Sequence, residues 1–135
     1  MSAARNNQRN NGKKEKPLIF VVDDEPMLLE LASAILQPEG FEVRTFRDPR
    51  TAMQEYMKSP PDIVVTDYAM GPMNGMELIR ECRSAHPEQK IMLLSGTVDE
   101  SIYFNEPVKP DCFLAKPYQV QKFIEMIKNL GGVTA

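Results

Sequence analysis

The sequence predicts an α/β protein: one domain with a doubly wound parallel sheet of five βα units. Short apolar runs alternate with amphipathic stretches of helical length from Pro17 onward, and this alternation is typical of parallel βα units. The first run, residues 18–22, is apolar on both faces, as expected of a strand that is covered by helices on both sides. A chain of 135 residues with 42% hydrophobic content can bury one core but is too short for two ordinary domains.

The apolar runs and the residues that stop them place the individual elements. The expected strands are 18–22, 41–46, 62–67, 91–95 and 112–115. Pro26 is expected to open the first helix and Asp48 to cap the second, while Asn74 and Glu77 have the spacing of a capping box for the third. The stripe expected to be buried on the first helix consists of Leu28, Leu31, Ala32, Ile35 and Leu36.

The fourth helix is expected to be short. Its candidate segment covers only about residues 98–105, because Pro107 and Pro110 follow and proline does not continue a helix. The fifth helix is expected to be of ordinary length and to end before Gly131 and Gly132.

The charge of the chain is unevenly distributed. Residues 1–16 carry five basic residues against Glu15, so we expect a disordered basic N-terminal extension, followed by a domain over residues 17–131 and a tail over 132–135. The remaining chain is acidic, which argues against direct nucleic-acid binding. No apolar run approaches the roughly 20 residues that a membrane helix needs, so we expect no membrane contact and a cytoplasmic location.

Polar residues stand where four of the five predicted strands end. They are Asp23, Asp24 and Glu25 after the first strand, Asp67 after the third, Ser95 after the fourth and Lys116 after the fifth. Ligands of a doubly wound sheet bind at this edge, and converging carboxylates repel one another unless a cation joins them. An all-oxygen site suits Mg²⁺ or Mn²⁺ better than zinc. With an ammonium and a hydroxyl nearby, the pattern predicts a phosphoryl site.

Taken together, these residues resemble the receiver family of two-component signalling, the CheY-like response regulators, over about residues 17–131. The family's acidic pair is matched by Asp23 and Asp24, its phosphoacceptor by Asp67, its hydroxyl residue by Ser95 and its Lys-Pro pair by Lys116-Pro117. The resemblance implies a flavodoxin-like sheet with strand order 2-1-3-4-5. It also implies a stand-alone receiver if the sequence is the whole product.

The resemblance further implies a metal site. Asp24, Asp67 and the backbone carbonyl of Ala69 would bind Mg²⁺ or Mn²⁺ directly, and Asp23 would bind it through water. Glu25 is interpreted as a solvent-facing residue of the first helical turn.

The role implied by the family is that of a phosphorylated switch, not of a classical enzyme. Asp67 would accept a phosphoryl group from a phosphohistidine of a sensor histidine kinase or histidine phosphotransfer protein, and would lose it by slow autodephosphorylation. Ser95 and Lys116 would contact the phosphoryl group. Phe113, which matches the family's aromatic switch, would move with Ser95 and change the surface offered to a downstream protein, whose identity is unknown.

Two departures from the family pattern keep an alternative open. The proline after the phosphoacceptor is shifted by one place, to Gly71-Pro72, and the fourth helix is short. Both favour a pseudo-receiver, which would be a constitutive protein-interaction module on the same fold. A small aspartyl phosphohydrolase fits less well, because the second acid such enzymes need is replaced by Ala69.

Overall fold

The protein forms a five-stranded parallel sheet in the order β2-β1-β3-β4-β5, as predicted. This computed structural model describes residues 16–96 and 100–132, so the expected extension lies outside the described residues except for Lys16, and the expected tail except for Gly132. The strands are β1 (Leu18–Val22), β2 (Glu42–Phe46), β3 (Ile63–Asp67), β4 (Lys90–Ser95) and β5 (Cys112–Ala115).

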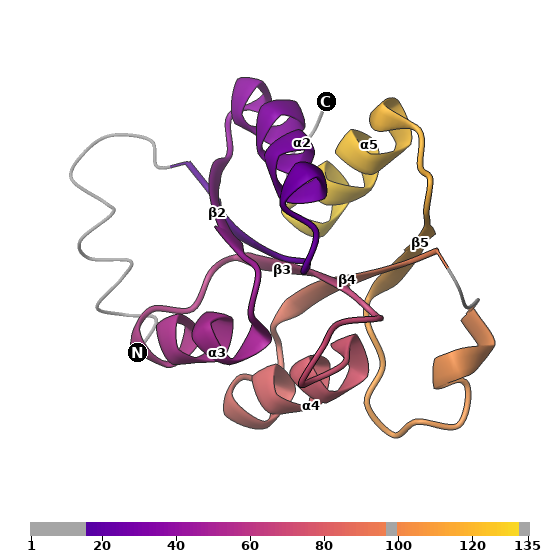
Figure 1. The fold of residues 1–135 in the computed structure, drawn as a ribbon. Coiled ribbons are helices and arrows are strands. Elements are labelled where there is room, and N and C mark those ends of the chain that lie inside the picture. The colour runs from indigo at the N-terminus through magenta and orange to yellow at the C-terminus, as the bar shows by residue number, and fades with distance from the viewer. Residues whose placement is uncertain (1–15, 97–99, 133–135) are drawn as a thin grey trace.

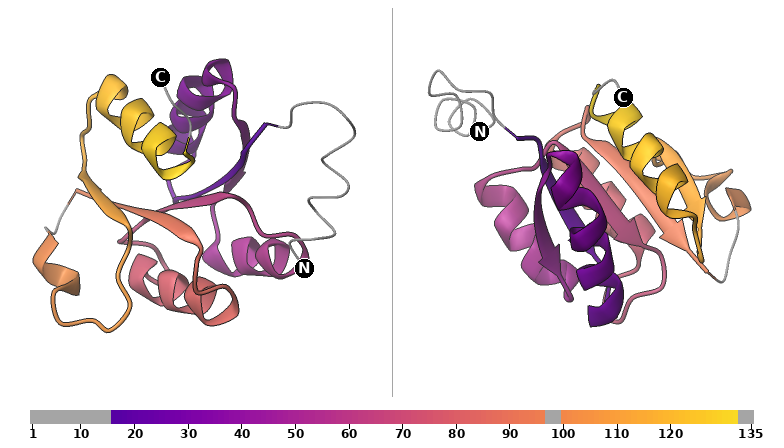
Figure 2. Two further views of the ribbon diagram at one scale, coloured as in Figure 1. Left: turned by 180° about the vertical axis from the view of Figure 1, so that it is seen from behind. Right: turned by 90° about the horizontal axis from the view of Figure 1, so that it is seen from above.

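Helices cover both faces of the sheet. The helices are α2 (Pro26–Leu36), α3 (Pro49–Lys58), α4 (Gly75–Ala85) and α5 (Val120–Leu130), with 3₁₀ turns η1 (Gln37–Glu39) and η2 (Glu100–Tyr103). Figures 1 and 2 show α2 and α5 on one face and α3 and α4 on the other. None of the helices in the described part of the chain has the length and apolar character needed to cross a membrane.

Alternate residues of the central strands pack into two separate hydrophobic cores. Phe20 and Val22 of β1 pack in the cluster beneath α3 and α4, while Ile19 and Val21 pack in the cluster beneath α2 and α5. This follows from the period of two in a strand, which sends successive side chains to opposite faces. Burial on both sides explains why β1 is apolar throughout.

The helix starts follow the sequence signals. Pro26 and Pro49 occupy the first turns of α2 and α3, and the Asp48 carboxylate accepts a hydrogen bond from the backbone N–H of Arg50. The capping box at α4 is complete, because Asn74 and Glu77 each accept the other's backbone N–H, at 2.9 and 2.8 Å.

The buried stripe of α2 differs from the predicted one. Leu29, Ala32 and Leu36 face the core, whereas Leu31 is 45% exposed, so its predicted burial was wrong. The spacing 29, 32, 36 is that of one helical face, and residue 31 lies about 100° away from residue 32 around the helix. Two adjacent leucines, at 28 and 29, made the phase ambiguous in the sequence.

The fourth helix is reduced to the four-residue η2 turn, and residues 98 and 99 of its expected range lie outside the described residues. The segment that leads from η2 to β5 is attached to α4 instead. Arg83 donates to the carbonyl of Lys109 at 2.9 Å and to the carboxylate of Asp111 at 2.8 Å, and Arg80 pairs with Glu106 at 3.2 Å. The expected shortening of this helix is confirmed.

Candidate functional site

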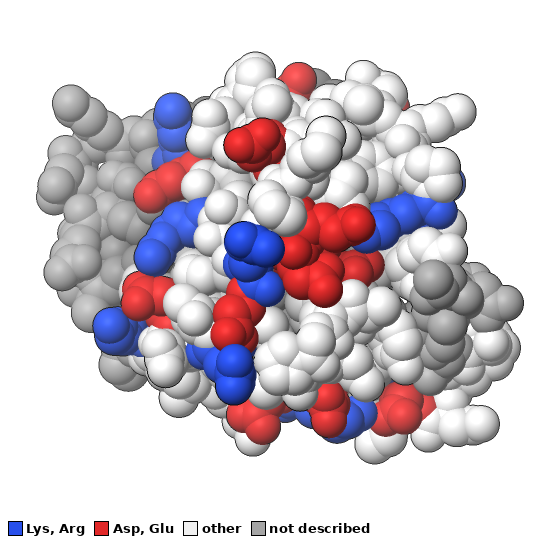
Figure 3. Space-filling model, in the orientation of Figure 1, with Lys and Arg blue, Asp and Glu red and all other residues white. Residues whose placement is uncertain are grey.

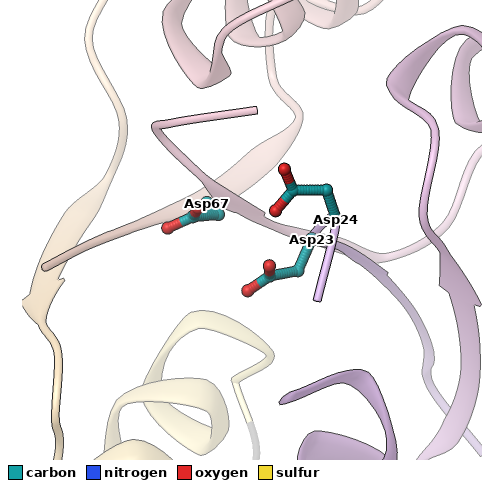
Figure 4. A group of neighbouring side chains, drawn as sticks. All are labelled: Asp23, Asp24 and Asp67. Carbon is teal, nitrogen blue, oxygen red and sulfur yellow. The ribbon is translucent and has the colours of Figure 1, made fainter. Parts of the chain in front are cut away.

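Three carboxylates meet where β1 and β3 end. β1 and β3 are neighbours with Val22 opposite Thr66, so Asp23 and Asp67 leave the sheet side by side, and Asp24 follows in the loop. One oxygen of each side chain lies within 4.8 Å of the others. Figure 4 shows the three side chains together at the strand ends, and Figure 3 shows acidic side chains gathered near the middle of this face.

The three carboxylates differ in their environment. Asp23 and Asp67 are only 2% and 6% exposed, whereas Asp24 is exposed. Both oxygens of Asp23 already have partners, because Oδ1 accepts the backbone N–H of Glu25 at 3.0 Å and Oδ2 lies 3.3 Å from Nζ of Lys116. Asp24 is therefore the more available ligand of the pair.

Lys116 joins the buried carboxylates from the opposite side of the site. Its Nζ lies 3.1 Å from Oδ1 of Asp67 as well as close to Asp23, and its side chain is only 17% exposed. Burial by itself would lower the pKa of Lys116, but the hydrogen bond and charge of Asp67, with the charge of Asp23, outweigh burial and raise it. The residue directly after β5 thus holds a charged ammonium inside the site.

The pKa of Asp67 is raised. Burial is the main cause, and the charges of Asp23 and Asp24 act in the same direction, while Lys116 opposes them. One ammonium therefore does not fully offset burial and the two neighbouring carboxylates, and a further positive charge would stabilise the ionised form of Asp67.

Ser95 lies on β4, which neighbours β3, and Phe113 lies on β5 at the edge of the sheet. Ser95 is buried and ends β4, and its carbonyl accepts the backbone N–H of Lys116 at 2.8 Å. Phe113 lies two residues before Ala115, the register partner of Ser95. Its ring is half-buried against the α3/α4 core, with its centroid 6.3 Å from that of Tyr103 in η2.

The loop from Asp67 to α4 contains Ala69, which is exposed. Gly71, next to the shifted Pro72, does not adopt a positive φ. Gly75 is the constrained position instead, because an added Cβ would lie 2.5 Å from the backbone oxygen of Asp67. This constraint at Gly75 was not predicted from the sequence, where its place directly after the helix cap Asn74 was the available signal.

The donor set fits a hard divalent cation. In the described part of the chain, the group that could hold a metal contains only carboxylates, from Asp23, Asp24 and Asp67. Hard cations such as Mg²⁺ and Mn²⁺ prefer oxygen ligands, whereas softer metals favour thiolate or imidazole.

Comparison with known proteins agrees with this fold and identifies the family. Residues 19–128 match the family model described as the response regulator receiver domain, and the chain belongs to this family. It is 28% identical over 115 residues to the chemotaxis protein CheY of Thermotoga maritima, covering 83% of this chain and 95% of that protein. A solved receiver domain protein from Clostridium thermocellum has a TM-score of 0.78 and 26% identity, covering 86% of this chain and 94% of the other.

Other relatives are longer. The chain is 26% identical over 110 residues to the DNA-binding response regulator MtrA of Mycolicibacterium smegmatis, which covers 82% of this chain but 48% of the relative. The chain thus spans about half the length of several curated relatives that it matches. Receiver domains are signalling switches, and membership of the family supports a phosphoacceptor signalling role for this chain.

Proposed function

We propose that this protein accepts a phosphoryl group on Asp67 in a Mg²⁺-dependent reaction and thereby changes the surface it offers to a partner. One observation carries the proposal: the buried Asp67 carboxylate lies 3.1 Å from an ammonium and within 4.8 Å of two further carboxylates. This arrangement provides a nucleophile, a positive charge and metal ligands around one atom.

In the proposed reaction, a carboxylate oxygen of Asp67 attacks the phosphorus of a phosphohistidine on a sensor histidine kinase or histidine phosphotransfer protein. The O–P bond forms as the P–N bond breaks, and the donor's imidazole leaves with the electron pair of that bond. The product is an acyl phosphate. Lys116, already beside Asp67, neutralises part of a phosphoryl charge of about −1.5 to −2. Slow attack of water on the acyl phosphate would return the protein to its starting state.

The cation is proposed to bind directly to Asp24, Asp67 and the carbonyl of Ala69, and through water to Asp23. The contacts of Asp23 support this division, because the Glu25 N–H and Lys116 occupy its two oxygens while Asp24 is exposed. A bound Mg²⁺, or Mn²⁺, would offset the negative charge that the phosphoryl oxygens add to the site.

The proposed conformational change begins at Ser95 and ends at Phe113. The hydroxyl of Ser95 would bind a phosphoryl oxygen and draw the end of β4 inward, which would let the half-buried Phe113 ring move. Because Phe113 lies near Tyr103, the surface around η2 and β5 would change for a downstream protein. The proposed partners are proteins in the cytoplasm, without direct contact with nucleic acid or membrane.

The pseudo-receiver is the second candidate, and the reduction of the fourth helix to η2 favours it. A constitutive interaction module needs the fold but no phosphoryl chemistry.

Phosphorylation by phosphoramidate, followed by intact-protein mass spectrometry, separates the two candidates. We expect the mass of one phosphoryl group to be added only when Mg²⁺ is present, and Asp67→Asn to prevent it. Glu25→Gln is the matched control, because Glu25 is exposed beside the site and should leave uptake unchanged. Folded wild-type protein that takes up no phosphoryl group would instead support the pseudo-receiver.

A further inference from the structure

A groove lies between α3 and α4. These two helices cover the face of the sheet opposite α2 and α5 (Figure 1). The volume of the groove is about 570 Å³. Met53 and Met57 of α3 and Met73 from the loop before α4 provide much of its apolar lining, and Arg50 and Glu81 are the charged residues on its walls. A volume of this size is in the range of binding pockets.

The three methionines line the same groove, and Met57 carries its apolar lining out to solvent. Met57 is 61% exposed, while Met53 and Met73 are half-buried and pack against the core beneath α3 and α4. Large exposed apolar side chains that continue into a groove mark interaction sites more often than scattered ones do. Methionine is unbranched and polarisable, so it adapts to apolar partners of different shape.

Of the charged side chains on the groove walls, one carboxylate is not used in an ion pair within the described residues. The cations of both helices have partners within the protein, as the following pairs show: Arg50 with Asp48, Lys58 with Glu55, Arg80 with Glu106 and Arg83 with Asp111. Glu81, on the groove wall, has no ion pair among residues 16–96 and 100–132. The groove is therefore complementary to a ligand that is apolar and positively charged.

We propose that this groove docks an amphipathic helix of a partner protein, with apolar side chains on the three methionines and a Lys or Arg beside Glu81. A groove between two packed helices accepts a third helix along its length. α3 has ten residues, which is about 15 Å of helix and matches two to three turns of the ligand. The proposal goes beyond the phosphoacceptor role and does not require phosphorylation of Asp67.

Methionine methyl NMR tests the proposal directly. Two synthetic helical peptides share one apolar stripe and differ only in having Lys or Glu beside it. We expect the Lys peptide to shift the methyl signals of Met53, Met57 and Met73, and to leave Met27, which is 80% exposed on α2, unchanged. Equal binding of the two peptides, binding of neither, or methyl shifts centred on Met27 would overturn the proposal.

Substitutions in the groove test which residues contact the peptide. Met57→Gln is expected to weaken binding of the Lys peptide by at least about fivefold, and Glu81→Gln by roughly two- to fivefold. Glu81→Lys should transfer the preference to the Glu peptide. Met27→Gln and Glu125→Gln are the matched controls on α2 and α5, and equal losses in the controls would show general electrostatic association with the acidic protein. All four positions are exposed, and unfolding midpoints verify that each variant is folded.

Discussion

The Nζ atom of Lys116 lies 3.1 Å from Oδ1 of Asp67, so the protein itself supplies a cation beside the proposed phosphoacceptor. Lys116 lowers the pKa of Asp67 against the larger effect of burial. The pair thus keeps a buried carboxylate closer to its ionised form.

Replacing Lys116 should change both the pKa of Asp67 and the affinity of the site for Mg²⁺. In Lys116→Met we expect the pKa of Asp67 to rise further, because the only opposing influence on that pKa is gone. We also expect Mg²⁺ to bind more tightly, because a positive charge beside the carboxylates has been removed. NMR titration of the Asp67 side-chain carbonyl carbon measures the first effect and calorimetry the second. Lys122→Met, at an exposed position of α5, should change neither.

The raised pKa of Asp67 predicts a dependence of stability on pH. Its pKa is higher in the folded state than the ordinary value of 3.8, so the folded state holds this proton more tightly. Its contribution to stability is present at low pH and is lost as pH rises through the folded pKa. Without divalent cations, Asp67→Asn should therefore become more stable than wild type as pH rises towards neutrality.

Urea unfolding across this pH range tests that dependence, and Asp48→Asn provides a control of opposite sign. The pKa of Asp48 is lowered, mainly by its side-chain hydrogen bond with Arg50, so the wild-type advantage at this position should be present near neutral pH and be lost as pH falls. A difference in the free energy of unfolding between wild type and Asp67→Asn that does not vary with pH would contradict the raised pKa.

Gly75 is the glycine that the site requires. In Gly75→Ala the new Cβ would lie 2.5 Å from the Asp67 carbonyl oxygen and 2.9 Å from a methyl carbon of Leu93, so backbone must move. We expect a loss of about 1–3 kcal/mol in the free energy of unfolding, together with slower phosphoryl uptake. Gly71→Ala, whose Cβ would meet nothing within 4 Å, should stay within about 0.5 kcal/mol of wild type. Equal effects at the two glycines would contradict the packing described.

Arg83 holds the segment that takes the place of a longer fourth helix. It donates to the carbonyls of Gln89 and Lys109 and to Asp111, and lysine cannot reproduce this planar fork. Arg83→Lys should lower the free energy of unfolding by about 1.5–3 kcal/mol and accelerate amide exchange before β5. Arg80→Lys, in the more exposed pair with Glu106, should cost at most about 1 kcal/mol. An Arg83 variant as stable as the Arg80 variant would argue against this role.

The sequence was sufficient for the fold because each element has a local signal. The apolar run of β1 and the capping box of Asn74 and Glu77 are read within a few residues, and parallel topology then brings Asp23 beside Asp67. What could not be predicted depends on contacts between distant segments. The Lys116 contact with Asp23 joins residues 93 positions apart, and the Arg83 contacts with the segment before β5 span more than 20 positions.

The environment of individual side chains also could not be predicted from local sequence patterns. The exposure of Leu31 depends on how α2 lies against the sheet, and the constraint at Gly75 depends on the path of the chain after Asp67. The proposed roles of Ser95 and Phe113 concern a phosphorylated state and that of Ala69 a metal-bound state, so all three stay predictions.

The central claim is that Asp67 accepts a phosphoryl group in a site completed by Mg²⁺. Two-dimensional NMR of wild type and Asp67→Asn, titrated with Mg²⁺ and then beryllofluoride as a phosphoryl mimic, tests it most directly. We predict that beryllofluoride shifts the signals of Ala69, Ser95 and Phe113 in wild type only, and only when Mg²⁺ is present. Spectra of folded wild type that do not change at saturating Mg²⁺ and beryllofluoride would contradict the claim.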